Sequence, residues 1–79
     1  MPTIKNVSGP YRFFFYNFDC NEPPHIHVQR ERMTCKFWLE PIALSTSNSF
    51  SDRELRRIWQ LIQQHLKRIL MEWEKHCGK

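Results

Sequence analysis

The chain has 79 residues, of which 41% are hydrophobic and 14% aromatic, and its formal net charge is +4. This length leaves room for one domain, and the apolar content excludes a disordered chain. The mild basic excess favours nucleic acid or an acidic surface as partner without requiring either. The longest apolar run, residues 13–16, is too short for a signal-peptide core or a membrane span, so we expect a cytoplasmic protein that does not enter membranes.

The three cysteines are widely spaced. Cys20, Cys35 and Cys77 form no Cys-x-x-Cys pair, and their number is odd. This pattern predicts neither a disulfide framework nor a four-thiolate zinc site, and a reducing cytoplasm fits it best.

The N-terminal half predicts strands. Residues 1–10 contain two prolines and a glycine and are expected to form an extended arm and a turn. Residues 11–18 predict a strand with aromatic side chains on both faces, part of which could form an interface. One face carries Tyr11, Phe13 and Phe15, and the other carries Phe14, Tyr16 and Phe18. A polar loop then leads to the next strand.

Two histidines alternate with branched residues directly after Pro23 and Pro24. Because successive side chains of a strand point to opposite faces, His25 and His27 share one face while Ile26 and Val28 share the other. We expect Ile26 and Val28 to face the core, and the two imidazoles to lie on an open surface that points away from the C-terminal helix.

The following segments complete the predicted sheet. Residues 29–32 predict a turn, and residues 33–40 predict a strand that places Cys35, Phe37 and Leu39 over the core. Residues 42–44 predict a short edge strand, and residues 45–49 a loop.

The last segment predicts one long helix over residues 51–77. Ser51 is the expected N-cap, with Glu54 completing a capping box, Phe50 as the hydrophobic staple and Gly78 as the stop signal. Apolar residues recur at helical spacing along one stripe. The opposite side collects basic residues and glutamines, among them Arg53, Arg56, Arg57, Lys67 and Arg68.

These elements predict a single domain over residues 1–79, with an arm (1–10), strands (11–44) and a helix (51–77). The fold class is α+β, with a three- to four-stranded antiparallel sheet and one long C-terminal helix packed on one face.

Several strings of the sequence resemble a known family. The strings are Met-Pro-Thr-Ile at residues 1–4, Arg-Phe-Phe-Phe-Tyr at 12–16, Glu-Pro-Pro-His-Ile-His-Val at 22–28, Lys-Phe-Trp-Leu at 36–39, and the helix start from Phe50 to Leu55. Together they resemble the domain of unknown function 4160, a family of small prokaryotic proteins. The resemblance implies a two-gene operon component of toxin–antitoxin type, with no established activity. The chain departs from the family pattern in lacking glycine within residues 29–32 and in having Ser49 where glycine commonly precedes the phenylalanine.

The histidine pair allows two kinds of chemistry. Both imidazoles of His25 and His27 point the same way and could hold a metal, with further ligands from Asp19, Glu22 or Cys20 or from the distant His65 or His76. They could also act as acid and base on a phosphodiester, with Arg30, Arg32 or Lys36 neutralising the phosphate. Parallel side chains suit in-line displacement poorly. The conservative interpretation is that the pair covers the sheet or bonds to Asp19, Glu22 or the backbone.

The basic helix face is the candidate for nucleic-acid contact, because arginine and lysine bind phosphates and a helix fits the major groove. A charged face is also what any soluble helix shows to water. The sequence thus favours a cytoplasmic binding module, one half of a toxin–antitoxin-like pair, that binds a protein encoded nearby and contacts DNA or RNA. The alternative is a histidine- or metal-dependent phosphodiesterase or RNase. We expect no cofactor, and the oligomeric state, including a homodimer, is left open.

Overall fold

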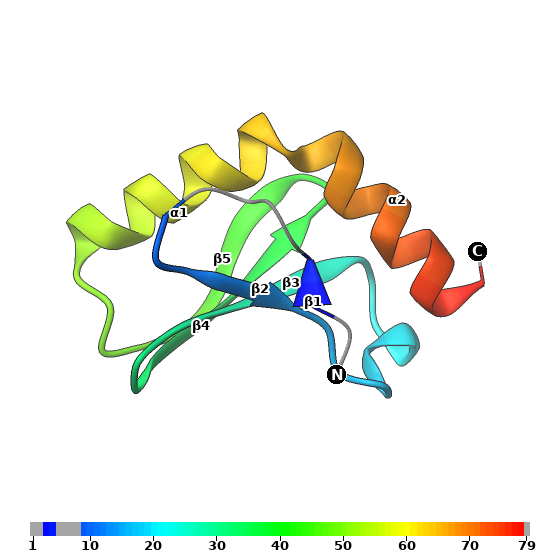
Figure 1. Cartoon of the computed structure of the whole chain (residues 1–79), viewed down its shortest axis with the longest axis horizontal. Coiled ribbons are helices and arrows are strands. Elements are labelled where there is room, and N and C mark those ends of the chain that lie inside the picture. The colour runs from blue at the N-terminus through cyan, green and yellow to red at the C-terminus, as the bar shows by residue number, and fades with distance from the viewer. Residues whose placement is uncertain (1–2, 5–8, 79) are drawn as a thin grey trace.

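The structure is a computed structural model that describes residues 3–4 and 9–78. Five strands precede two helices that lie across one face of the sheet (Figure 1). The strands are β1 (Thr3–Ile4), β2 (Arg12–Phe14), β3 (His25–Arg30), β4 (Met33–Leu39) and β5 (Ile42–Asn48). A 3-10 turn, η1 (Asp19–Asn21), lies between β2 and β3, and the helices are α1 (Asp52–Gln64) and α2 (Leu66–Cys77).

The sheet is an antiparallel meander in the order β1-β2-β3-β4-β5. The α+β class is confirmed, but the predicted three or four strands are five. Part of the expected N-terminal arm forms the extra strand, since Thr3 and Ile4 pair with Phe14 and Phe13. The prediction for residues 1–2 and 5–8 of the arm lies outside the described residues.

The last strand is longer than its composition predicts. Residues 45–48, predicted as part of a loop, continue β5 and pair with β4 across a register shift between Lys36 and Phe37. Their side chains are mostly exposed. At a sheet edge the backbone hydrogen bonds to β4 stabilise the strand, so serine and asparagine are tolerated there despite their preference for turns, and threonine is itself favoured in strands.

The core lies between the helices and one face of the sheet. The predicted alternation is confirmed on the three central strands, where the inward residues of each strand are almost completely buried. These residues are Phe13, Ile26, Val28, Cys35, Phe37 and Leu39. They pack against Ile58, Ile62, Ile69 and Trp73 of the helices.

The helical segment begins at the predicted N-cap and ends at the predicted glycine, but it is interrupted in the middle. The Glu54 carboxylate bonds to Arg30 and Tyr11, so within the described residues the predicted capping box is only half formed. Ser51 Oγ accepts a hydrogen bond from the Glu54 N–H at 3.2 Å, and Gly78 ends the helix with a φ of 71°. His65, with φ −111° and ψ 15°, separates α1 from α2, so the single predicted helix is two. No proline or glycine marks the break. It allows α2 to turn down over the end of the sheet, where it reaches η1 (Figure 1).

Each of the two turns in which the sequence departs from the family that it resembles contains a residue with left-handed backbone. Glu31, in the β3–β4 turn, has a φ of 55°, and Ser49, between β5 and α1, has a φ of 78°. A side chain at such a φ costs about 1 kcal/mol or more relative to glycine. The departures noted in the sequence therefore fall on turns that glycine would fit better.

Within the described part of the chain, neither helix has the length and apolar character needed to span a membrane.

Candidate functional site

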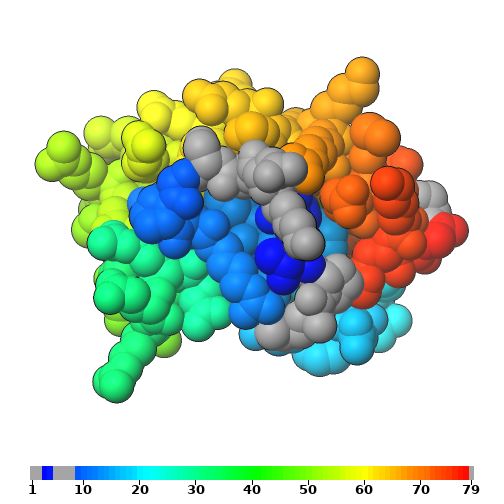
Figure 2. Space-filling model, in the orientation of Figure 1, coloured from blue at the N-terminus to red at the C-terminus, as the bar shows by residue number. Residues whose placement is uncertain are grey.

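The first candidate surface is the outer side of α1. Arg53, Arg56 and Arg57 are exposed and line one shallow hollow together with Gln60. Their spacing places them on adjacent turns of one helix face, away from the sheet. The helices form the upper surface of the molecule in Figure 2, so this face is open to a large ligand.

Among the residues that the structure describes, the cations of this face form no ion pairs. In the described residues, none of the five predicted nucleic-acid contacts forms an ion pair with a carboxylate. Glu54, the acid among the three arginines, accepts a hydrogen bond from Arg30 at 2.6 Å and one from the Tyr11 hydroxyl at 3.4 Å. This carboxylate is thereby engaged by Arg30 and Tyr11 and not by the three arginines of the outer face.

Not all five predicted cations belong to this hollow. Lys67 is exposed and Arg68 half-buried, and both lie on α2 beyond the break at His65. Ten residues of helix separate Arg57 from Lys67, which corresponds to about 15 Å. We name Arg53, Arg56 and Arg57 the basic patch, and Lys67 and Arg68 extend it along the helical layer.

The second candidate site is a buried cluster of Asp19, His25 and His27. The carboxylate of Asp19 lies between the imidazoles, with Oδ1 3.1 Å from Nε2 of His25 and Oδ2 3.1 Å from Nε2 of His27. Asp19 is 3% exposed, and the side chains of His25 and His27 are 0% and 18% exposed. Loop and strand meet because η1 folds back onto the start of β3. The cluster is therefore enclosed by protein on almost every side.

Backbone groups hold two members of the cluster in place. The Tyr16 N–H donates to Oδ2 of Asp19 at 2.7 Å. Nδ1 of His25 lies 2.9 Å from the carbonyl oxygen of Pro23. A carbonyl can only accept, so Nδ1 of His25 carries the proton.

The cluster shifts the pKa values of two of its members. Burial favours the neutral form of Asp19, but the hydrogen bond from the Tyr16 N–H, followed by the attraction of His25 and His27 in their protonated forms, outweighs burial and lowers the pKa of this carboxyl. Burial also lowers the pKa of His27, and the nearby carboxylate offsets only part of that effect. The cluster therefore tends to hold a charged Asp19 beside a neutral His27.

The structure corrects the expected surroundings of the histidine pair. Ile26 and Val28 face the core as predicted, and His27 lies on the opposite sheet face beside Phe14 and Lys36. His25, however, is not on an open surface. Its ring lies 5.6 Å from that of Trp38 and 5.2 Å from that of Trp73 on α2, so the end of the second helix helps to enclose it.

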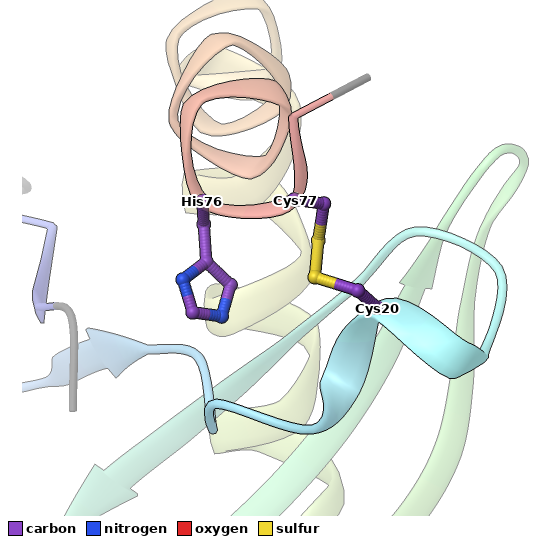
Figure 3. Close-up of side chains that lie close together, drawn as sticks. All are labelled: Cys20, His76 and Cys77. Carbon is purple, nitrogen blue, oxygen red and sulfur yellow. A yellow bond between two sulfur atoms is a disulfide. The ribbon is translucent and has the colours of Figure 1, made fainter.

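A disulfide fastens α2 beside this cluster. Cys20, which follows Asp19 in η1, is bonded to Cys77 at the end of α2, and His76 lies next to the bond (Figure 3). Nε2 of His76 is 2.9 Å from the carbonyl oxygen of Tyr16, and its ring stacks on Phe15. The expectation that the cysteines form no disulfide is wrong, because folding brings together two residues that are 57 positions apart.

The third cysteine has a thiol of low reactivity. Cys35 is free and buried in the core, and burial raises the pKa of its thiol to about 12. A thiol protonated at neutral pH is a poor nucleophile and a poor metal ligand.

An aromatic surface lies beside the cluster on the sheet face opposite the helices. Phe18 is 69% exposed and stacks on Tyr16 with ring centroids 5.6 Å apart. Tyr16 in turn meets the edge of His27 at 4.7 Å. A hollow lined by Tyr16, His27 and Lys36 continues this surface across the sheet.

Sequence reasoning identified His25, His27 and the cations, and it named Asp19 among several further ligands. It placed neither Trp73 nor His76 near the pair, because both are distant in the chain. The spacing of Trp73 within the apolar stripe was the available signal, but it indicated burial only.

Comparison with known proteins agrees with the strings noted in the sequence. A family model described as Domain of unknown function (DUF4160) matches residues 11–74. The match contains the whole Asp19, His25 and His27 cluster and the basic patch, and it ends before Cys77. No curated protein and no solved structure matches the chain. The chain therefore belongs to the DUF4160 family of domains of unknown function.

Proposed function

We propose that this protein is a small binding module that contacts nucleic acid through the basic patch and a protein partner through its aromatic surface. It would act as one member of a toxin–antitoxin-like pair. The observation that carries the proposal is the basic patch itself: three exposed arginines on one helix face, with the neighbouring Glu54 hydrogen-bonded to Arg30.

The geometry favours binding over proton transfer by the histidine pair. His25 is completely buried, its Nδ1 faces the Pro23 carbonyl and its Nε2 faces Asp19. A general acid or base must reach the reacting group within hydrogen-bond distance or through one water. Neither nitrogen of His25 is placed to do so, which leaves no acid and base pair.

The basic patch also has the chemistry that phosphate contact requires. Arginine presents several donors in one plane and binds phosphate in a bidentate manner. Gln60, which lines the same hollow, adds an amide that can donate to phosphate or to a base edge. On duplex DNA, five neutralised phosphates would give a slope of log K against log salt of about −4.5.

Titration of labelled duplex DNA and RNA at several salt concentrations tests the nucleic-acid contact. The triple variant R53Q/R56Q/R57Q should weaken binding and reduce the salt slope by about 3, one for each lost contact. The matched control R12Q/R32Q/K75Q removes the same charge from other parts of the surface and should keep most of the slope. If both triple variants lost the same affinity and the same salt slope, binding would depend only on the net charge of the protein. That result would contradict a specific contact through the basic patch.

The exposed aromatic stack supports the partner contact. Phe18 offers a large apolar ring to solvent beside Tyr16, and aromatic residues are enriched at protein interfaces. Co-expression with the product of the adjacent gene, scored by co-purification and by growth arrest, tests this contact. F18S should abolish co-purification, whereas M71S, which removes an exposed apolar side chain from α2, should not. Absence of any complex with the wild-type chain would refute this part of the proposal.

A further inference from the structure

In the Asp19, His25 and His27 cluster, two hydrogen-bond acceptors face each other with no donor between them. Because Nδ1 of His25 donates to the Pro23 carbonyl, Nε2 of the neutral ring carries a lone pair, and this lone pair faces the carboxylate of Asp19 at 3.1 Å. Two acceptors in contact repel each other unless a cation lies between them. In the part of the chain that the structure describes, Nε2 of His25 and Nε2 of His27 are both buried without a hydrogen bond of acceptable geometry.

The three donor groups converge as metal ligands do. One nitrogen of each imidazole and one carboxylate oxygen lie within 4.8 Å of one another. Two ligands bound to zinc at about 2.0–2.1 Å in tetrahedral directions are roughly 3.3 Å apart, close to the two 3.1 Å nitrogen–oxygen separations. The Pro23 carbonyl that fixes the tautomer of His25 is the kind of outer partner that metal-bound histidines require.

We propose that Asp19, His25 and His27 bind one divalent transition-metal ion, and that zinc is the ion that best matches these donor groups. Two imidazole nitrogens and one carboxylate suit zinc, and they are also the donor set of non-haem iron(II) sites. The ion would replace the repulsion between Nε2 of His25 and Asp19 with two favourable bonds.

The site would join η1 to β3 and so serve a structural purpose. Asp19 is the first residue of η1, and His25 is the first of β3. Cys20, the next residue of η1, is already bonded to the end of α2. Metal and disulfide would then fasten consecutive residues of one turn to the sheet on one side and to the helical layer on the other. This role is independent of nucleic-acid binding by the basic patch.

A second group, Cys20, His76 and Cys77, also has its donor atoms within 4.8 Å of one another. Its two sulfur atoms are bonded to each other, so it offers no thiolate (Figure 3). After reduction this group would compete for zinc. The two sites differ in their donor atoms, which makes them distinguishable by spectroscopy.

Metal content of the full chain tests the proposal. Protein stripped with chelator and then dialysed against zinc should retain one zinc per chain, measured by mass spectrometry of the metal, and should melt at a higher temperature than the stripped protein. D19N, which keeps an acceptor for the Tyr16 N–H, and H27Q should each weaken zinc binding at least tenfold. H65Q, a change at a histidine outside the cluster, should bind zinc like the wild type.

Two measurements identify the ligands even if a variant fails to fold. The cobalt(II) form of the wild type, with its disulfide intact, should lack the intense thiolate-to-cobalt band. In nitrogen-15 spectra of the wild type, zinc should shift Nε2 of His25 and of His27 and leave His65 and His76 unchanged.

Several outcomes would overturn the assignment. A chain that retains no zinc, a thiolate band in the cobalt form, or an equal loss of affinity in H65Q would each do so. A His25 ring that remains protonated on both nitrogens in the presence of excess zinc would show that a proton, and not a metal, relieves the repulsion in the cluster.

Discussion

The two ends of the helical layer use charged and polar residues in opposite ways. At the α1 end, Arg53, Arg56 and Arg57 lie in water without partners in the described part of the chain. At the α2 end, Asp19 and His25 are buried and have only protein around them. Exposed charges cost the fold little and remain available to a ligand, whereas buried polar groups must be satisfied internally or by a bound ion.

This difference suggests that the basic patch serves binding, whereas the buried cluster serves the stability of the fold. Substitutions in the basic patch should change binding and leave stability almost untouched. Substitutions in the buried cluster and at the disulfide should lower the free energy of unfolding and leave nucleic-acid binding almost unchanged. The following experiments challenge that division.

Removal of the disulfide should have the largest effect on stability. The bond between Cys20 and Cys77 closes a loop of 57 positions, and the loss of this constraint on the unfolded chain corresponds to about 4 kcal/mol in the loop-entropy model. Urea unfolding of C20S/C77S, compared with the wild type with and without reductant, measures it. The reduced wild type should match the variant. If reduction has no effect, the α2 end is held by packing alone.

Asp19→Ala should be the next most damaging change. In the zinc-loaded protein it removes one ligand of the proposed metal site, and it leaves the Tyr16 N–H without its acceptor, at a cost of about 3 kcal/mol in the free energy of unfolding. The control is Asp52→Ala, which removes an exposed carboxylate from the first turn of α1. Urea unfolding at neutral pH should show a small change for the control. Similar losses in both variants would remove the distinction between the two ends.

The stability of the metal-free protein should fall as the pH is lowered. The pKa of His27 is below its ordinary 6.5 in the folded state, so the folded protein binds fewer protons than the unfolded chain below that pH. Stability present above pH 6.5 is therefore lost as the pH falls towards the folded pKa. Asp19, with a pKa lowered from 3.8, acts in the same direction at more acid pH.

Melting temperatures measured in chelator from about pH 7.5 to about pH 5, on both sides of the ordinary histidine pKa of 6.5, test this dependence. H27Q should flatten the curve, and H65Q should not. A stability that rises on acidification would mean that the folded cluster takes up protons.

Ser49→Gly should stabilise the protein modestly, by about 1 kcal/mol. Ser49 precedes α1 with a φ of 78°, which glycine adopts without strain. Thermal unfolding measures the gain, and Ser47→Gly, a change within β5, should instead destabilise. The α1 end would then contain a local strain that is independent of its charges. A loss of stability in Ser49→Gly would mean that unfolded-state entropy outweighs the relief.

The smallest effect on stability is expected from the basic patch. Arg56→Gln should change the free energy of unfolding by less than about 0.5 kcal/mol, because the side chain is exposed and unpaired. The same variant should reduce the salt slope of nucleic-acid binding by about 1. Urea unfolding and the titration above measure both. A large loss in the free energy of unfolding would show that Arg56 stabilises the fold, and would contradict a role for the basic patch in binding alone.

Local patterns of the sequence determined much of the fold. Alternation assigned the faces of Phe13, Ile26 and Val28, and the signals at Ser51 and Gly78 located both ends of the helical segment. The basic patch was also predictable, because residues on one helix face are placed by their spacing alone. Each of these features depends on interactions within a few positions of the chain.

Only the tertiary structure decided the rest. The break at His65, the pairing of Cys20 with Cys77 and the enclosure of His25 by Trp73 all depend on how α2 meets the end of the sheet. Alternation can place an imidazole on a sheet face, but whether water reaches it depends on side chains that fold in from far along the chain. The sequence determined which residues share a face, and the long-range packing of α2 and η1 determined which of them are buried together.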